Sequence, residues 1–413
     1  MKKILIFLVS LLSMHISYAE DYLSELYKSQ FIDFSFNKDL SSFSATSYDA
    51  WLKDWKNITW KYDGGISNAV YSPDWKKFAY EGGIRVHKDG SDYTYWEVVV
   101  NWKILKWRYE QTFNPSFSKA WDLYFFWKKN NRSELLKNWK VISSKNYDVS
   151  EFAISDDNKS LSYVWYKNDR AYLIKDGKII AKDFEYIDSL KYSPRSSDIF
   201  YITHLKDKTS LYKNSSLIFS DYDITLNWNS FAPDWSSYSY LFSRDNKFEL
   251  ISILIKDWKV IKSWYSAMAL LTYSPDSNNL AYAWYNWKWY IIKNGKVVSK
   301  WYSYRPREII FSPDSKSFSF VVDSWWQKTS VAKDWVIINT SFKSSQNVIY
   351  SSDSKHYFYI WCNDNDACNI IKDWTIIKTT PDILTNIFVS ETWNKILYAW
   401  IRDDKYYVAT MDY

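Results

Sequence analysis

A phrase of about ten residues recurs along this 413-residue chain, and it constrains the fold more than any other feature. Copies such as YSPDWKKFAY from Tyr71 and YSPDSNNLAY from Tyr273 join a Ser-Pro-Asp turn to a short apolar run. The nine full or shortened copies, about 39 residues apart, begin at Tyr71, Phe117, Ile154, Tyr192, Phe231, Tyr273, Phe311, Tyr350 and Val389. Self-similarity at a fixed period of this length indicates a repeat architecture rather than several unrelated domains.

A second phrase alternates with the first and is typified by IKDGKIIAK around Gly177 and IKNGKVVSK around Gly295. Related copies surround Trp55, Trp102, Trp139, Ser215, Trp258, Trp335 and Trp374. Asp or Asn followed by Gly, between runs rich in Ile, Val and Tyr, is typical of a hairpin turn that needs positive φ. The Ser-Pro-Asp turn likewise ends one strand before the next begins. Each repeat therefore predicts four short strands and almost no helix.

Four strands in ~40 residues, repeated eight or nine times, predict an all-β chain forming a single β-propeller of eight or nine four-stranded blades. Packing blades face to face in a ring buries both faces and leaves only short edges. An open β-solenoid is the alternative fold. We expect residues 51–413 to form the propeller and strands in residues 20–50 to complete the last blade, because the chain ends at Tyr413 without a final hairpin phrase. A faint extra copy at Asn37–Asp39 leaves the blade number open by one.

The phrase Tyr/Phe-Ser-Pro-Asp-x-Lys-x-Leu-Ala-Tyr resembles the WD40-like (PD40) repeat of bacterial propellers, as in the periplasmic propeller of the Tol–Pal system. It is also similar to the propellers attached to prolyl-oligopeptidase-like hydrolases. The resemblance covers nearly all of the chain from about residue 35 onward. It implies the architecture and says little about function. Two features depart from these families: residues 20–50 are too short for the α/β domain of the Tol–Pal protein, and no hydrolase domain is present.

The first 19 residues have the pattern of a secretory signal peptide. Lys2 and Lys3 form a basic start, Ile4–Met14 is an apolar core, and Ser17 and Ala19 place small residues before the expected cleavage site. A buried N-terminal helix is the alternative. No later stretch approaches the ~20 apolar residues of a membrane span, and no cysteine follows the apolar core. We therefore expect an exported protein, periplasmic or at the cell surface, with no transmembrane segment in the mature chain.

Charge and cysteine content constrain the partners only loosely. Removing residues 1–19 removes two lysines and no acids, which lowers the formal charge from +6 to +4. The charges are interspersed, so no nucleic-acid partner is indicated. We also expect the chain to be a monomer. Export favours a disulfide between the only cysteines, Cys362 and Cys368, over two free buried thiols. Asp364 and Asp366 between them are calcium candidates, although they lack the spacing of a known calcium loop.

The chain contains 26 tryptophans beside seven glycines, and the tryptophans occupy turn positions. In the nine hairpin phrases, the residue after Asp or Asn is Gly twice, Ser once and Trp six times. Trp75 and Trp235 likewise follow Asp in the Ser-Pro-Asp turn, where the resembling family usually has Gly. A left-handed backbone costs a residue with a Cβ ~1 kcal/mol or more. We predict an alternative genetic code, in which UGA codons that specify glycine were read as tryptophan; Trp and Gly together number 33, an ordinary glycine share.

The sequence contains no recognisable catalytic residues and indicates no cofactor. His87, His204 and His356 fall at different points of their repeats, so no metal site is expected. Gly-x-Ser-x-Gly is absent even when every Trp is reread as Gly, and no phosphate-binding or dinucleotide motif occurs. The Ser-x-Asp turns are faintly similar to the Asp-box of sialidase propellers but lack its Thr-Trp ending. A propeller glycoside hydrolase or lyase with paired carboxylates is therefore only an alternative.

A non-catalytic exported propeller that binds a protein or a cell-envelope ligand is the function that the sequence favours. Tyrosines that recur in one position of the first phrase indicate packing between blades, namely Tyr80, Tyr163, Tyr201, Tyr240, Tyr282 and Tyr398. Binding residues are expected where the repeat is broken. The irregular stretches are Gly82–Tyr95, Arg305–Arg307 and the loop between Cys362 and Cys368. Carbohydrate binding is a further alternative if the tryptophans are genuine.

Overall fold

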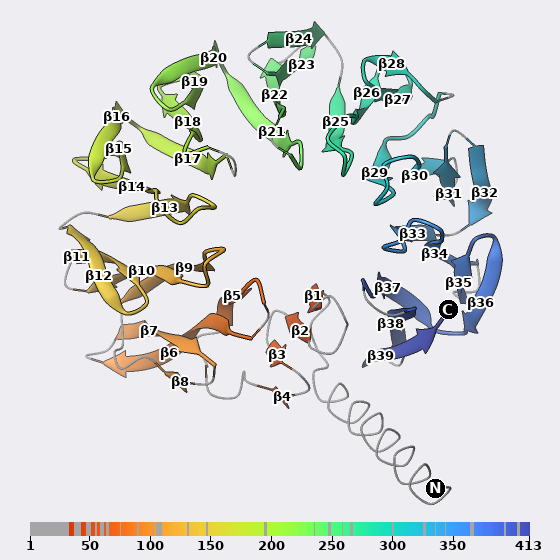
Figure 1. Ribbon diagram of the computed structural model, residues 1–413, viewed down its shortest axis with the longest axis horizontal. Helices are drawn as coiled ribbons and strands as arrows, with labels where there is room; N and C mark the ends of the chain where they lie inside the picture. Colours follow the sequence, from red (N-terminus) through yellow and green to blue (C-terminus); the bar gives the residue numbers. More distant parts are fainter. Residues whose placement is uncertain are drawn as a thin grey trace, which may run out of the picture. The chain divides into compact units, whose positions relative to one another are not determined.

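The structure is a computed structural model, and its described part is all-β. It describes residues 33–36, 43–46, 51–53, 56–57, 62, 66–74, 76–88, 91–101, 103–104, 110–129, 132–145, 148–193, 196–234, 236–246, 249–257, 259–264, 267–299, 301–324, 328–334, 336–342, 344–363, 367–391, 394–402 and 405–413. The described strands form nine four-stranded antiparallel sheets and one three-stranded sheet. Within each sheet the strands follow one another in sequence order (Figure 1). Among the described residues, no helix is long and apolar enough to cross a membrane.

The chain divides into two compact units, of which one consists mainly of residues 57–225, here called the 57–225 unit. It holds four sheets. Their strands are β5 (Ile66–Tyr71), β6 (Phe78–Lys88), β7 (Ser91–Val100) and β8 (Lys103–Ile104); β9 (Gln111–Phe117), β10 (Leu123–Lys129), β11 (Arg132–Lys137) and β12 (Lys140–Lys145); β13 (Val149–Ile154), β14 (Leu161–Lys167), β15 (Arg170–Lys175) and β16 (Lys178–Phe184); and β17 (Tyr186–Tyr192), β18 (Ile199–Leu205), β19 (Lys208–Lys213) and β20 (Ser216–Tyr222).

The other unit consists mainly of residues 226–413, here called the 226–413 unit. Its strands are β21 (Ile224–Phe231), β22 (Tyr238–Asn246), β23 (Glu249–Lys256) and β24 (Lys259–Trp264); β25 (Met268–Tyr273), β26 (Leu280–Tyr285), β27 (Trp289–Lys293) and β28 (Lys296–Val297); β29 (Pro306–Phe311), β30 (Phe318–Ser324), β31 (Lys328–Lys333) and β32 (Val336–Phe342); β33 (Ser344–Tyr350), β34 (Tyr357–Cys362), β35 (Cys368–Lys372) and β36 (Thr375–Thr380); and β37 (Ile383–Val389), β38 (Lys395–Arg402) and β39 (Lys405–Asp412).

A further sheet lies near the N-terminus. It is formed by β1 (Asp33–Phe36), β2 (Phe43–Thr46), β3 (Trp51–Lys53) and β4 (Lys56–Asn57), and it coincides with the faint extra copy of the repeat. The described pairings keep it separate from β37–β39, so completion of the last sheet by N-terminal strands stays a prediction. The last sheet, β37–β39, has three described strands. Nine four-stranded sheets in an all-β chain are consistent with a β-propeller and agree with the predicted number of blades.

In eight of the described sheets, an Asn or Asp at the turn between the third and fourth strands bonds the start of the second strand. The Oδ1 atom of Asn101 accepts a hydrogen bond from Phe78 N at 2.9 Å, and Asn101 N donates to Phe78 O at 3.1 Å. The same pair of bonds recurs in eight sheets, at Asn101, Asn138, Asp176, Asn214, Asp257, Asn294, Asp334 and Asp373. All eight residues have φ between 42° and 51°. The hairpin turn thus starts with Asn or Asp for two reasons. The side chain of this residue caps the start of the second strand, and Asn and Asp tolerate a left-handed backbone.

The serine of the Ser-Pro-Asp turn is buried and closes the turn on itself. Ser72 Oγ donates to Asp74 Oδ1 at 2.6 Å and accepts a hydrogen bond from Lys77 N at 2.9 Å. The Ser-to-Asp bond recurs at Ser155, Ser274, Ser312 and Ser351. In these turns the aspartate therefore accepts a hydrogen bond that holds the turn together, as expected for an Asx-type turn.

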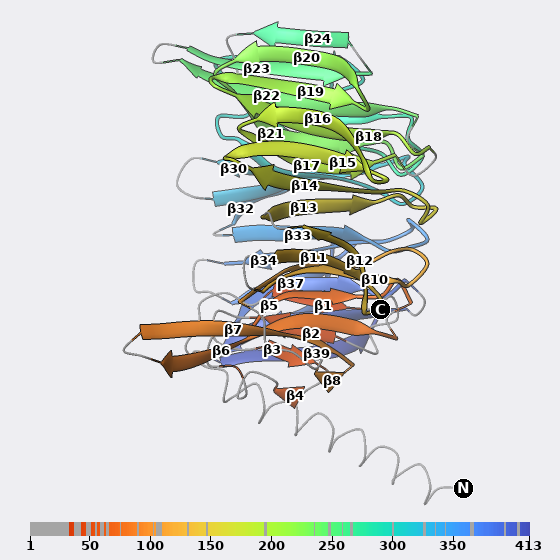
Figure 2. The same cartoon turned by 90° about the vertical axis from the view of Figure 1, so that its left-hand side faces the viewer.

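Packing between successive sheets uses the aromatic positions of the first phrase. The first strands of several neighbouring sheets touch, namely β5 and β9, β13 and β17, β25 and β29, and β33 and β37. In Figure 2 the sheets β13–β16 and β17–β20 follow one another. The hydroxyl of Tyr350, at the end of β33, is hydrogen-bonded to Ser319 Oγ of the preceding sheet at 2.6 Å. The recurrent tyrosines predicted to pack between blades are all buried, with 1–8% of their surface exposed: Tyr80, Tyr163, Tyr201, Tyr240, Tyr282 and Tyr398.

Candidate functional site

A cleft of about 480 Å³ opens between the sheet β5–β8 and the sheet β9–β12, both in the 57–225 unit. Its lining combines apolar, amide, ammonium and indole groups. The lining residues are Lys77, Val100, Asn101, Lys103, Ile104, Phe117, Trp121, Leu123, Asn138 and Trp139. The volume lies in the range of ligand sites, which are commonly ~300–1,000 Å³.

The cleft is built from four turns of two neighbouring sheets. Lys77 ends the Ser-Pro-Asp turn before β6, Asn101 lies in the hairpin turn between β7 and β8, and Lys103 begins β8. Trp121 lies in the turn before β10, and Trp139 in the turn between β11 and β12. The sequence analysis missed this site because it searched the irregular stretches. The signal was the shortened copy of the phrase, FSKAWDLYF from Phe117, which brings Trp121 close to the start of its second strand.

The charge of the cleft is positive. None of its lining residues is acidic. Neither Lys77 nor Lys103 forms an ion pair with any residue that the structure describes. Both side chains are exposed, so two uncompensated ammonium groups stand beside an apolar floor formed by residues such as Leu123 and Phe117.

The two indoles of the cleft stand on left-handed backbone. Trp121 has φ of 65° and Trp139 has φ of 75°, and both side chains are about half exposed. Trp374, in the hairpin turn of another sheet, has φ of 80°. Gly177 and Gly295, in the same position of their own hairpins, have φ of 80° and 77°. A bulky residue with φ above zero is an outlier, whereas glycine adopts this region freely.

The irregular stretch Gly82–Tyr95 forms the outer part of the β6–β7 hairpin, whose strands have 11 and 10 residues. Gly82 lies directly against Tyr62, since a Cβ built on Gly82 would lie 2.3 Å from the tyrosine ring. At the hairpin's far end, exposed His87 and Asp92 are 2.7 Å apart. This stretch therefore lengthens a hairpin, and it does not line the cleft between β5–β8 and β9–β12.

The stretch Arg305–Arg307 is tied to its own sheet. Pro306, which begins β29, is buried. Arg307 Nη2 lies 2.9 Å from Asp323 Oδ1, and Arg307 Nε donates to Asp323 Oδ2 at 3.2 Å, which joins β29 to β30. This paired geometry shows that Arg307 forms a cross-strand ion pair with Asp323.

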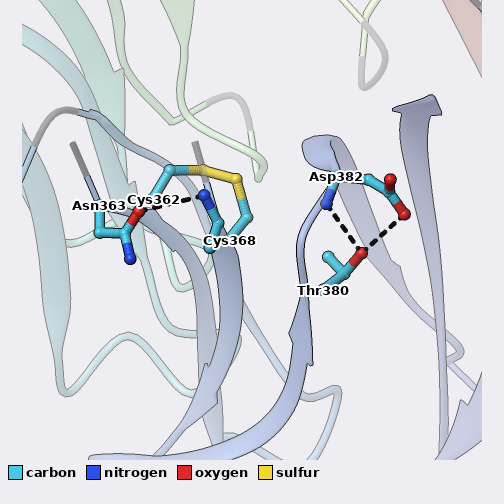
Figure 3. Close-up of a disulfide and its surroundings, with 6 residues drawn as sticks. Cys362, Asn363, Cys368, Thr380 and Asp382 are labelled. Atoms are coloured by element: carbon cyan, nitrogen blue, oxygen red, sulfur yellow. Dashed lines mark hydrogen bonds between the residues drawn. A yellow bond between two sulfur atoms is a disulfide. The ribbon is translucent and has the colours of Figure 1, made fainter. Parts of the chain in front are cut away.

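Cys362 and Cys368 are joined by a disulfide at directly opposed positions of β34 and β35 (Figure 3). Ala367 N donates to Asn363 Oδ1 at 3.1 Å and narrows the base of the same loop. In the neighbouring turn, Thr380 Oγ1 donates to Asp382 Oδ2 at 2.9 Å. Asp364 and Asp366 lie outside the described residues, so their calcium-binding role stays a prediction.

Each of the three histidines in the described residues lies beside one aspartate of its own sheet. His204 Nε2 is 3.2 Å from Asp188 Oδ2, and its ring stacks on Tyr186 with centroids 3.8 Å apart. His87 contacts Asp92, and His356 contacts Asp373. No group of three or more metal-ligating side chains occurs among the residues that the structure describes.

Two partly buried glutamates bridge successive sheets, and the sequence analysis did not single them out. Glu151 Oε1 accepts a hydrogen bond from Leu190 N at 3.0 Å, and Glu308 Oε1 accepts one from Val348 N at 3.3 Å. Burial raises the pKa of Glu151 to about 7, with the hydrogen bond from Leu190 opposing the shift and the charge of Asp188 adding to it. Burial also raises the pKa of Glu308. Both residues stand four positions before the turn serine, which is the only sequence signal they carry.

Comparison with known proteins yields structural likeness alone. No protein-family model and no curated protein matches the sequence. A eukaryotic initiation factor is similar at 11% identity with a TM-score of 0.45, covering 73% of this chain and 85% of that one. The Dos1 propeller is similar at 9% identity with a TM-score of 0.39, covering 83% and 92%. The β-propeller domain of Cps50 (Swd1) from Myceliophteria thermophila is similar at 9% identity with a TM-score of 0.29, covering 63% and 95%. Similarity at this level says nothing about what the chain binds.

Proposed function

We propose that this chain is a non-catalytic, exported propeller of the bacterial WD40-like type that binds a protein or a cell-envelope component. The supporting observation is the cleft of about 480 Å³ between β5–β8 and β9–β12, which combines apolar residues with two lysines that form no ion pair with any described residue. An open, positively charged cleft in an array of otherwise similar sheets suits recognition of a partner.

Quantitative capture tests this proposal. The chain without residues 1–19 is immobilised and exposed to envelope extract, and bound material is displaced with the free chain. We expect saturable capture of a defined protein or envelope polymer that the free chain displaces. Absence of displaceable material would overturn the proposal, and so would turnover of labelled envelope glycans, which would favour the glycoside hydrolase or lyase.

Export is part of the same proposal and rests on residues 1–19, which lie outside the described residues. Expression of the full chain in a bacterial host, followed by fractionation and N-terminal sequencing, tests it. We expect a periplasmic or secreted product that begins at Glu20. A product that retains Met1 in the cytoplasm would contradict export.

Carbohydrate binding is the second candidate, and a specific observation favours it. Trp121 and Trp139 both line the cleft with about half of their surface exposed, and exposed indoles form stacking platforms for sugars. This candidate holds only if both residues are tryptophan in the natural protein.

The backbone conformation of several tryptophans supports the alternative, that these positions are glycine in the natural protein. Trp121, Trp139, Trp287 and Trp374 all have φ between 60° and 80°, the region of Gly177 and Gly295. Recurrent strain of ~1 kcal/mol per residue with no visible compensation supports UGA codons that the source organism reads as glycine. Mass spectrometry of the natural protein decides the matter, since the peptide containing position 139 differs in mass between the two readings. Tryptophan there would restore carbohydrate binding as the first function to assay.

A further inference from the structure

We propose that the cleft between β5–β8 and β9–β12 binds a short peptide segment that carries acidic and apolar side chains. This inference rests on the proposed binding function and deepens it by naming the partner's chemistry. It is carried by the comparison of this junction between sheets with the corresponding junctions elsewhere in the chain.

In the 226–413 unit, the fourth residue of three described Ser-Pro-Asp turns bonds the turn of the preceding sheet. Ser277 Oγ accepts a hydrogen bond from Asp234 N of the preceding sheet at 2.8 Å. Ser315 does the same with Asp276 N, and Ser354 with Asp314 N, also at 2.8 Å. A small hydroxyl side chain at this position therefore joins one turn directly to the next by a hydrogen bond.

In the 57–225 unit, the junction after the cleft is closed by longer side chains. Asn158, again the fourth residue of its turn, donates through Nδ2 to Asp122 Oδ2 at 2.5 Å and accepts from Tyr124 OH at 3.0 Å. Lys119 adds an ion pair with Asp156 at 2.5 Å.

The cleft lacks both members of this bridge. Trp121 occupies the position of Asn158 within its turn. Lys77, directly before β6, occupies the position that Asp122 has directly before β10. An indole offers one donor and no acceptor, and an ammonium group offers donors alone, so the two side chains have no hydrogen bond to make with each other. The junction stays open for this reason.

The lining residues indicate which chemical groups a ligand of this cleft should carry. Lys77 and Lys103 supply positive charge that no carboxylate among the lining residues neutralises. Val100, Ile104 and Phe117 supply the apolar wall. Carboxylates at the rim and aliphatic side chains against the wall complement both features. Glycine at positions 121 and 139 would widen the cleft and leave these five residues in place, so the inference holds under either reading of the tryptophans.

Fluorescence anisotropy with two labelled peptides tests the inference. One eight-residue peptide alternates Glu and Leu, and the other alternates Gln and Leu. We expect the Glu peptide to bind at least tenfold more tightly and to weaken as salt rises. The double variant K77Q/K103Q should lose at least tenfold in affinity for it. The matched control is K178Q/K296Q, because Lys178 and Lys296 are exposed and follow their hairpin glycines as Lys103 follows Trp102; this control should bind like the parent chain.

Three results would overturn the inference: equal affinity for the two peptides, no loss in K77Q/K103Q, or tighter binding of an oligogalacturonate than of the Glu peptide. The thermal unfolding of each variant is measured in parallel, since these exposed lysines are not expected to affect folding. The envelope capture assay separates the two proposals. Capture that is unchanged in K77Q/K103Q leaves the proposed function standing and removes this inference, whereas absence of capture by the parent chain removes the function itself.

Discussion

Asp176 is joined to the backbone of Leu161 by two hydrogen bonds, one through its carboxylate and one through its own backbone N–H. Leu161 N donates to Asp176 Oδ1 at 2.8 Å, and Asp176 N donates to Leu161 O at 2.9 Å. The pair fixes the start of β14 against the turn between β15 and β16, with Asp176 at φ of 49°. Because the same pair of bonds recurs in eight sheets, it is a principal reason why the hairpin turn starts with Asn or Asp.

We predict that Asp176→Ala lowers the free energy of unfolding by about 1–2 kcal/mol, since it removes one hydrogen bond and places alanine on left-handed backbone. Chemical denaturation measures the change. Asp176→Asn is the matched control and should retain most of the stability, because Asn138 and Asn294 make the same bond in their own sheets. Equal losses in the two variants would show that the cap contributes little.

Replacing Trp374 by glycine should raise the free energy of unfolding by about 1 kcal/mol, because φ of 80° is unstrained only for glycine. The indole is 61% exposed, so little packing is lost. Trp374→Ala keeps a Cβ and should show no such gain. The reverse change, Gly295→Ala, should cost about 1 kcal/mol through backbone conformation alone, since a Cβ there would meet no atom within 4 Å. A loss of stability in Trp374→Gly would argue that the tryptophan is native.

The repeat predicted the sheets because its two turn phrases mark where strands end. The Ser-Pro-Asp turn and the hairpin turn both appear in the structure at the expected places, including the left-handed position that Gly177 fills. The cleft was not predictable in the same way. It depends on Lys77 and Trp121, which stand in different repeats and meet only when neighbouring sheets pack. Contacts between repeats carry no local signal, and for this reason Glu151 and its partner Leu190 were also missed.

Stability should depend on pH through Glu151. Its pKa is about 7 in the folded chain against an ordinary 4.5, so the folded state holds the proton more tightly. The contribution of this group is fully present below pH 4.5 and is lost as pH rises through 7. Glu151→Gln keeps an acceptor for Leu190 N and cannot ionise, so the parent should lose roughly 1–3 kcal/mol relative to the variant between pH 4.5 and 8.

Urea denaturation at pH 4.5, 6 and 8 measures this difference. The exposed Glu185 provides the control, and Glu185→Gln should follow the parent at every pH. Asp188→Asn removes a neighbouring charge that raises the pKa of Glu151, and it should move the transition to lower pH. If Glu151→Gln and the parent chain show the same pH dependence, this carboxylate does not titrate in the range given.

Pairs of residues that pack between successive sheets should behave as coupled units. Tyr350 bonds Ser319, Tyr273 bonds Ser239 and Tyr192 bonds Ser162, whereas Ala281 in the serine position faces Phe311 in the same apolar cluster. Ser319 is fully buried, so Tyr350→Phe leaves the Ser319 hydroxyl without its tyrosine partner. This change should lower the free energy of unfolding by about 1–2 kcal/mol. Ser319→Ala should cost a similar amount by leaving the tyrosine hydroxyl unbonded.

The double variant S319A/Y350F recreates the natural pair of Ala281 and Phe311 and should cost less than the sum of the single changes. A double-mutant cycle in urea gives the coupling energy, which we expect to be about 1 kcal/mol and favourable. Ala281→Ser alone is the matched control: it introduces a buried hydroxyl opposite Phe311 and should destabilise the chain, while A281S/F311Y should recover part of that loss. Strictly additive energies in both cycles would mean that burial of the rings, and not the hydrogen bond, joins these sheets.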